Sequence, residues 1–184
     1  MQIFTAKNEL IQYLEKLANK QIIGFVPTMG ALHEGHASLI KESNKECDVT
    51  ICSIFINPIQ FNNSKDLANY PNTLKKDLTL LKNENCDIVY APEVSDLYKK
   101  GEVAKNYSFG GIATLMEGIH RPGHFNGMAT VVEKFFKIIN PSKAFFGEKD
   151  LQQLQIVKKL VKKMKASIEI INVPTVREKN GLAK

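Results

Sequence analysis

The chain has 184 residues, of which 43% are apolar and 24% are charged, as in an ordinary globular protein. These proportions exclude an intrinsically disordered chain, a collagen-like chain and a coiled coil, and no apolar run is long enough to cross a membrane. The formal net charge of +6 favours anionic partners, either nucleic acids or phosphorylated small molecules.

Short apolar runs alternate with helical patterns along the whole chain. Six runs predict β-strands: Gln2–Phe4, Ile22–Val26, Val49–Phe55, Asp87–Ala91, Ala144–Phe146 and Ile168–Val173. Helical spacing predicts helices at Thr5–Leu17 (Thr5 as N-cap), Glu34–Glu46, Pro71–Glu84 (Pro71 in the first turn), Gly127–Ile139 and from Leu151 onward. The alternation predicts an α/β fold, a parallel sheet with helices on both faces, and Val94–Gly111 is expected to be a connection outside the core.

Cysteines and lysines suggest where the chain works and what it contacts. Cys47, Cys52 and Cys86 are odd in number and form no CxxC pair, and no secretory signal precedes them, so we expect buried thiols in a reducing cytoplasm. Five late lysines alternate with apolar residues at helical spacing (Lys158, Lys159, Lys162, Lys163 and Lys165). This pattern is typical of the solvated face of an amphipathic helix, with a nucleic-acid surface as the alternative.

Three loops that follow predicted strands are expected to share one site, because ligands of open parallel sheets bind beyond the carboxyl ends of the strands. They are Pro27–Gly35, Phe55–Phe61 and Gly147–Asp150.

The first of these loops leads from a strand through glycine into a helix, and the helix N-terminus offers free N–H groups to an anion. His33 and His36 are three residues apart and can lie on one side of the first turn, while Gly35 permits close approach of a ligand. The pair suits a departing polyphosphate. A metal site or an incidental pair remains possible from this segment alone, but neither HExxH nor a Walker loop is present.

Two further segments place polar side chains beside apolar ones. Gln60 follows a strand and could hold a hydroxyl or carboxylate of a small substrate, or could bond its own loop. The segment Gly118–Gly127 holds His120, Arg121 and His124 among glycines. It could line an anionic site, or Arg121 could pair only with a surface carboxylate.

The third loop again leads from a strand through glycine into a helix. Lys149 can reach a phosphate there as a point charge, and Gln153 follows one turn later on the same face. Asp150 can cap the helix, which is its alternative role.

Together these segments resemble the pantoate–β-alanine ligase family of the nucleotidylyltransferase superfamily over essentially the whole chain. The matching segments are PTMGALHEGH (Pro27–His36), FINPIQF (Phe55–Phe61), YPNTLKKDL (Tyr70–Leu78), RPGHFNGM (Arg121–Met128), FFGEKDLQQL (Phe145–Leu154) and VPTVREKNGLAK (Val173–Lys184). The resemblance implies a Rossmann-like sheet and an enzyme that uses ATP with Mg²⁺ to join pantoate to β-alanine through a pantoyl adenylate. It further implies a homodimer that binds neither nucleic acid nor membrane.

The resemblance also assigns roles to residues. It implies ATP contacts from Met29, Gly30, Ala31, Leu32, His33, Glu34, Gly35, His36, Gly147, Glu148, Lys149, Asp150, Val176 and Lys184. It implies catalytic roles for His36, His33 and Lys149, and contacts to pantoate and β-alanine from Gln60 and Gln153. Asp77 would be an outer partner of Mg²⁺.

In this family the segment after Gly-Leu-Ala continues as Ser-Ser-Arg-Asn, and a lid domain follows. We therefore expect residues 1–184 to be the nucleotide-binding domain, which folds by itself but catalyses poorly or not at all without the Ser-Ser-Arg segment and the lid domain. Two rivals remain. Another nucleotidylyltransferase would share the His-X-Gly-His loop without needing both glutamines, and a basic nucleic-acid-binding domain would leave the histidine loops unexplained.

Overall fold

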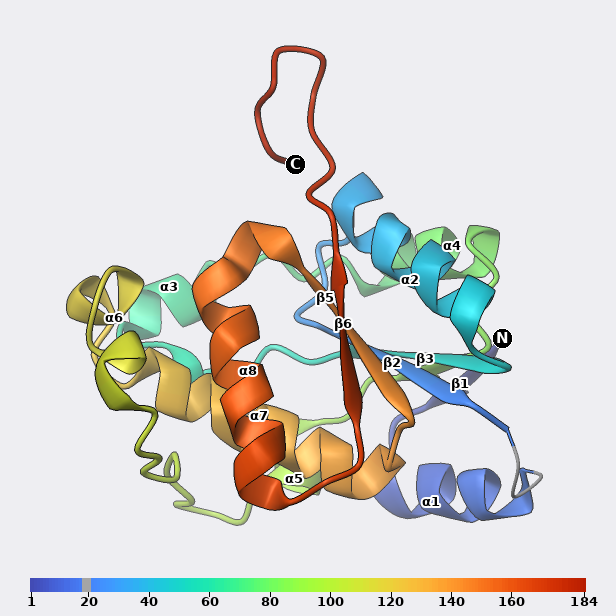
Figure 1. The fold of residues 1–184 in the computed structure, drawn as a ribbon. Coiled ribbons are helices and arrows are strands. Elements are labelled where there is room, and N and C mark those ends of the chain that lie inside the picture. The colour runs from blue at the N-terminus through green and yellow to red at the C-terminus, as the bar shows by residue number, and fades with distance from the viewer. Residues whose placement is uncertain (18–20) are drawn as a thin grey trace.

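The computed structural model describes residues 1–17 and 21–184. Within these residues six strands form one parallel sheet (Figure 1). They are β1 (Gln2–Phe4), β2 (Ile23–Thr28), β3 (Val49–Ile54), β4 (Ile88–Tyr90), β5 (Lys143–Gly147) and β6 (Glu169–Val173). Their spatial order is β1-β4-β3-β2-β5-β6, which confirms all six predicted strands and the α/β fold class.

Helices cover both faces of the sheet, as the alternation predicts (Figure 1). The helices are α1 (Lys7–Lys16), α2 (Glu34–Glu46), α3 (Ser64–Ala68), α4 (Leu74–Asn83), α5 (Val94–Leu97), α6 (Glu117–His120), α7 (His124–Ile139) and α8 (Leu151–Met164). Short 3-10 turns lie at Pro58–Gln60, Gly110–Ala113 and Glu148–Asp150. Helices α2 and α4 pack on one face, and α1, α7 and α8 pack on the other.

The two faces of the sheet bury alternate residues of each strand. On β2, Phe25 packs against Phe135 of α7, with ring centroids 5.7 Å apart, whereas Val26 belongs to the cluster that includes Ile40 of α2. Side chains of a strand alternate between the two faces, and here both faces are covered. This double burial explains why the central strands read as continuous apolar runs.

Two predicted helix starts are wrong. Helix α1 has Ala6 rather than Thr5 at its N-cap position, and its first N–H, from Lys7, donates to Asp96 at 2.8 Å. A distant carboxylate thus replaces the local cap. Helix α4 begins at Leu74, so Pro71 lies in the preceding connection rather than in the first helical turn.

The region around the fourth predicted helix also differs. Helix α7 begins at His124, three residues earlier than predicted, directly after Gly123 with φ +80°. The sequence did not indicate the short helices α3 and α6. The segment Val94–Gly111 contains α5 and is not outside the core, because Tyr98 and Phe109 are buried in the main apolar cluster.

Beyond β6 the chain turns back toward the N-terminal end of α2 (Figure 1). The N–H of Lys184 donates to the carbonyl of Val176 at 3.0 Å, and the Lys184 ammonium pairs with Glu34 on the first turn of α2. This return places the last residues of the chain beside the predicted nucleotide loop.

The three cysteines differ in burial. Cys52 and Cys86 are buried as predicted, but Cys47 at the end of α2 is only partly buried. In the described part of the chain, no helix combines the length and the apolar character needed to span a membrane.

Candidate active site

A cleft of about 280 Å³ opens at the carboxyl ends of β2 and β5. These neighbouring strands continue into helices on opposite faces of the sheet, α2 and α8, which makes the gap between them a topological switch point. Ligands of open α/β sheets bind at such points. All three loops expected to share a site contribute side chains to the cleft.

Most of the predicted site residues line this cleft, and some do not. Those that line it are Met29, His33, Gly35, His36, Gln60, Gly147, Lys149, Asp150, Gln153, Val176 and Lys184. Those that lie outside its lining are Gly30, Ala31, Leu32, Glu34, Glu148 and Asp77. In the second group, Ala31 and Leu32 belong to the loop after β2, and Asp77 accepts hydrogen bonds from both of them.

Asp77 holds the loop after β2 from behind. Its carboxylate accepts the backbone N–H of Ala31 at 3.1 Å and that of Leu32 at 2.8 Å, and the Thr73 hydroxyl donates to both of its oxygens. Ala31 has φ +52°, a left-handed conformation that costs a non-glycine residue energy. The buried carboxylate therefore stabilises a strained turn.

A metal cage is not built from the protein alone. Across the residues that the structure describes, no three His, Cys, Asp or Glu side chains gather to hold an ion. Both oxygens of Asp77 are already engaged by N–H and hydroxyl donors. A nucleotide can carry Mg²⁺ on its own phosphates with one or two protein carboxylates and water, and Asp150 is the carboxylate that lines the cleft.

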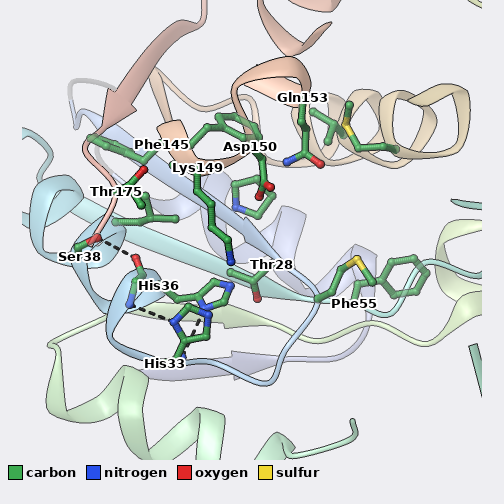
Figure 2. A pocket seen from close by; sticks show the side chains of 18 of the residues that line it. Thr28, His33, His36, Ser38, Phe55, Phe145, Lys149, Asp150, Gln153 and Thr175 are labelled. Atoms are coloured by element: carbon green, nitrogen blue, oxygen red, sulfur yellow. Dashed lines mark hydrogen bonds between the residues drawn. The ribbon is translucent and has the colours of Figure 1, made fainter. Parts of the chain in front are cut away.

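His33 and His36 form a reciprocal cap on α2 (Figure 2). The His33 Nδ1 accepts from the N–H of Gly35 at 3.1 Å, and the His36 Nδ1 accepts from the N–H of His33 at 3.4 Å. Because each Nδ1 is an acceptor, the neutral rings carry their proton on Nε2. Each histidine thus keeps one N–H for a ligand.

Burial and positive neighbours keep both rings neutral. Burial, then His33 and Lys149, lower the pKa of His36 from 6.5 to about 4. Burial and the ammonium groups of Lys149 and Lys184 also lower the pKa of His33. At neutral pH the positive charge that faces the cleft therefore comes from lysine, and the imidazoles act as neutral hydrogen-bond donors.

The loop after β5 supplies the charge and a second polar group. Figure 2 shows Lys149 extended toward His36 and Thr28, and Gln153 facing the cleft from α8. Asp150 stands at the N-cap position of α8, where the alternative prediction placed it as a helix cap. Its side chain makes no capping hydrogen bond, however. Its carboxylate lines the cleft instead.

Gln60 also lines the cleft and is buried. Its Oε1 accepts from Nδ2 of Asn57 at 3.0 Å, and its Nε2 donates toward the sulfur of Met29. The amide therefore does not bond its own loop backbone, which was the alternative. Asn57 was not among the predicted site residues, although a polar residue straight after a buried strand was a usable signal.

The apolar wall of the cleft is a second feature that the sequence did not reveal. Met128, Val131, Val132 and Phe135 of α7 line the cleft together with the two glutamines. In the sequence these residues could not be told from ordinary core positions of an amphipathic helix.

The loop before α7 supports the site without lining it. Arg121 pairs with Glu117 at 2.5 Å, which is its alternative role, and neither Arg121 nor His120 lines the cleft. His124 is buried and its Nδ1 lies 2.9 Å from the carbonyl of Gln60. Gly127 lets the segment with Ile59 and Gln60 approach α7 closely, since an added Cβ would stand 2.4 Å from the Ile59 carbonyl oxygen.

The arrangement joins two chemistries in one cleft. An ammonium group, two neutral imidazole donors and a helix N-terminus suit phosphate oxygens. Two uncharged amides and an apolar wall line the same cleft, and they suit a small polar molecule with aliphatic carbons.

Comparisons with known proteins identify the family. The family model described as pantoate-beta-alanine ligase matches residues 2–184. The pantothenate synthetase of Christiangramia forsetii is 50% identical over 100% of this chain and 66% of its own length, and that of Carboxydothermus hydrogenoformans is 48% identical over 100% and 65%. The chain thus spans about two thirds of the length of these relatives.

Solved structures agree. The crystal structure of pantoate-beta-alanine ligase from Francisella tularensis, complexed with beta-gamma ATP and beta-alanine, has a TM-score of 0.97 and 43% identity, and the match covers 100% of this chain and 70% of that one. Pantothenate synthetase from Thermus thermophilus has a TM-score of 0.92 and 40% identity, with coverage of 100% and 65%. The predicted resemblance is confirmed, and the chain belongs to the pantoate-beta-alanine ligase family.

Proposed function

We propose that this chain carries the ATP and pantoate sites of a ligase that condenses pantoate with β-alanine. In the first step the pantoate carboxylate attacks the α-phosphorus of ATP, which forms pantoyl adenylate and releases pyrophosphate. In the second step the amine of β-alanine attacks the acyl carbon, and the acyl C–O bond breaks to release AMP and pantothenate.

One observation carries this proposal: a single cleft is lined by Lys149 with two imidazoles, here called the phosphate end, and by two uncharged amides, here called the pantoate end. The first end matches a polyphosphate and the second matches pantoate, whose hydroxyl and carboxylate oxygens flank an aliphatic centre. A relative at 43% identity is complexed with beta-gamma ATP and beta-alanine, which supports ATP and β-alanine as two of the ligands here.

The phosphate end acts by positioning and charge. His33 and His36 donate Nε2–H to phosphate oxygens, and Lys149 neutralises negative charge that builds on the departing pyrophosphate. Groups held in place before the reaction stabilise such charge without reorganisation. No protein nucleophile is needed, because the pantoate carboxylate is the nucleophile.

The pantoate end orients that carboxylate. Gln60 and Gln153 donate to pantoate oxygens without adding charge that would hold the carboxylate away from ATP. Met128 and Phe135 take the methyl groups and exclude water from the acyl adenylate.

Further parts of the proposal follow from the family. Mg²⁺ enters as part of the nucleotide substrate, the backbone of Val176 meets the adenine, and the protein works as a cytoplasmic homodimer that binds no nucleic acid. Residues 1–184 act as the nucleotide-binding domain, and turnover by these residues alone is slow because a lid domain closes the site in the whole enzyme.

Calorimetric titration with Mg-ATP tests the phosphate end directly. Wild type should bind, and Lys149→Ala should weaken binding about tenfold or more, because a charge-assisted contact is lost. Lys158→Ala on α8 is the matched control, since it removes a lysine that does not line the cleft. Equal affinity of Lys149→Ala and wild type would contradict the phosphate assignment, and no binding at millimolar ATP would contradict the proposed function.

A further inference from the structure

A buried carbonyl fixes the orientation of the Asn57 side chain. Asn57 Nδ2 lies 3.0 Å from the carbonyl oxygen of Gly127, and that oxygen can only accept a hydrogen bond. The nitrogen of the amide must therefore face Gly127 and, beside it, the Oε1 of Gln60. The Asn57 oxygen then faces Tyr98, which does not line the cleft.

The hydroxyl of Tyr98 meets that oxygen. Tyr98 Oη lies 2.9 Å from Asn57 Oδ1, and because this oxygen is an acceptor the hydroxyl is the donor. Both side chains are buried, Asn57 completely and Tyr98 with 7% exposure. A buried acceptor that loses its donor costs free energy of folding. Each hydrogen bond in the series from Tyr98 through Asn57 to Gln60 therefore depends on the next.

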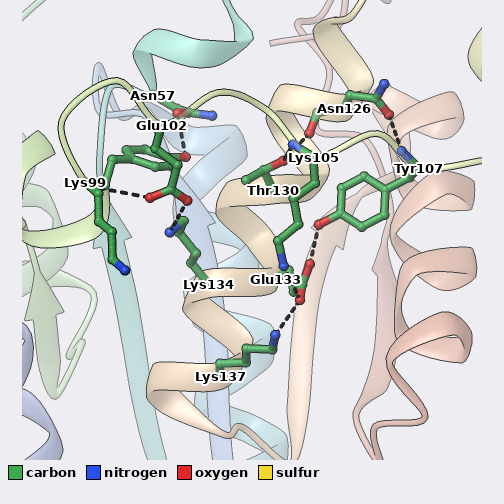
Figure 3. A network of polar contacts seen from close by, with 11 residues as sticks. Asn57, Lys99, Glu102, Lys105, Tyr107, Asn126, Thr130, Glu133, Lys134 and Lys137 are labelled. Carbon is green, nitrogen blue, oxygen red and sulfur yellow. Dashed lines mark hydrogen bonds and ion pairs between the residues drawn. The ribbon is translucent and has the colours of Figure 1, made fainter.

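The surroundings hold Tyr98 in place. Its ring lies between Phe55, with centroids 6.1 Å apart, and the Lys134 ammonium, 4.8 Å from the ring centroid. Lys134 in turn pairs with Glu102 at 2.7 Å (Figure 3). Burial raises the pKa of the Tyr98 hydroxyl well above its usual value, which keeps it protonated and able to donate.

The segment that follows Tyr98 is also tied to α7 (Figure 3). Glu133 of α7 accepts from the Lys105 ammonium at 2.9 Å and from the Tyr107 hydroxyl. Helix α7 carries part of the cleft wall, so the same helix positions the wall and anchors the segment that follows Tyr98.

We propose that Tyr98 is a positioning residue for substrate: together with the Gly127 carbonyl, its hydroxyl holds the Asn57 amide, and this amide holds Gln60 so that Gln60 presents only its Nε2–H₂ group to the cleft. Gln60 then acts solely as a donor, which selects a ligand with an acceptor oxygen at that point. This inference rests on the proposed function for the identity of the ligand, pantoate. The series of hydrogen bonds from Tyr98 through Asn57 to Gln60, here called the relay, is a property of the free protein.

Nuclear magnetic resonance on the free chain tests the relay without any substrate. In wild type, the side-chain amide hydrogens of Gln60 should show a nuclear Overhauser effect to the Met29 methyl group. Tyr98→Phe removes only the hydroxyl and should abolish or strongly reduce that effect and shift both amide resonances. Tyr90→Phe is the control: it removes another buried hydroxyl, which donates to Asp96 and not to Asn57.

Unchanged Gln60 resonances and contacts in Tyr98→Phe would overturn the proposal. Wild type supplies a second reading that does not depend on the variant folding. The Asn57 side-chain amide should exchange its hydrogens slowly with solvent, because it is buried and its nitrogen donates two hydrogen bonds. Fast exchange of that amide would also overturn it.

Pantoate titration then measures the consequence for binding. Tyr98→Phe should weaken pantoate about three- to tenfold and leave Mg-ATP affinity unchanged, and the same substitution in a Gln60→Ala background should have no further effect. An additive loss in the double variant would contradict action through Gln60. If wild type binds no pantoate while the resonance results hold, the proposed substrate is wrong and the relay stands.

Discussion

The rings of His33 and His36 pack edge to face, with centroids 4.2 Å apart and planes inclined at 65°. Each ring is also held by a backbone N–H on its Nδ1. Burial and nearby Lys149 lower the pKa of both rings, and His33 further lowers the pKa of His36. The pair is thus a neutral donor site.

This neutrality predicts a stability change with pH. In the unfolded chain His36 takes up a proton near its usual pKa of 6.5, whereas in the folded chain it does so only near a pKa of about 4. The unfolded state therefore binds more protons between these values, so the free energy of unfolding should fall as pH decreases from about 6.5 to about 4. Above about pH 6.5 the contribution of neutral His36 to the free energy of unfolding is fully present and constant.

Urea unfolding at several pH values checks this expectation. His36→Asn should flatten the dependence between about pH 6.5 and pH 4, while His120→Asn, at an exposed position, serves as the matched control. If wild type and His36→Asn lose stability in parallel over this range, the inferred neutrality of His36 is wrong.

Asp77 is expected to act on the nucleotide through the loop it holds. Asp77→Asn replaces one acceptor oxygen with a donor that faces a backbone N–H, and it should lower the free energy of unfolding by about 1–3 kcal/mol. ATP affinity should fall as well, because Ala31 loses the contact that stabilises its left-handed conformation.

Nucleotide titration with and without magnesium separates this role from metal binding. A positioning role predicts that Asp77→Asn weakens ATP to the same extent in Mg²⁺ and in EDTA. A loss confined to the Mg²⁺ titration would instead make Asp77 a partner of the ion, as the family resemblance implies. Thr79→Ala, at an exposed hydroxyl on the same helix, is the control.

The two glutamines should set the affinity for pantoate and not for ATP. Gln60→Ala and Gln153→Ala each remove an uncharged donor from the lining of the cleft. Each should cost about 1–3 kcal/mol of pantoate binding with little change in ATP affinity. Gln152→Ala, the neighbouring glutamine that bonds the carbonyls of Ile112 and Leu115, is the control. Losses of similar size for both substrates would count against this division of the cleft.

The sequence predicted the strands and the location of the site because both depend on local patterns. Strands such as β3 are continuous apolar runs, and loops after parallel strands meet at one edge whatever their detailed path. The start of α1 could not be predicted, since Asp96, distant in sequence, satisfies its first N–H. Tertiary contacts of this kind override local capping preferences.

The polar interior of the site was also beyond the sequence. Tyr98 lies in a segment of low periodicity, and only the folded chain brings its hydroxyl to Asn57. The same holds for Asp77, whose role depends on a loop more than forty positions earlier in the sequence. Neither pairing has a spacing from which it could be inferred.

The fate of the pantoate carboxylate oxygens tests the central claim most directly. Pantoate labelled with ¹⁸O in both carboxylate oxygens would be incubated with Mg-ATP, β-alanine and the chain in excess over ATP, so that slow turnover is still detected. Attack on the α-phosphorus predicts AMP that carries one ¹⁸O atom and pantothenate that keeps the other, as measured by mass spectrometry. Release of ADP with ¹⁸O in inorganic phosphate would mean attack on the γ-phosphorus and would contradict the account.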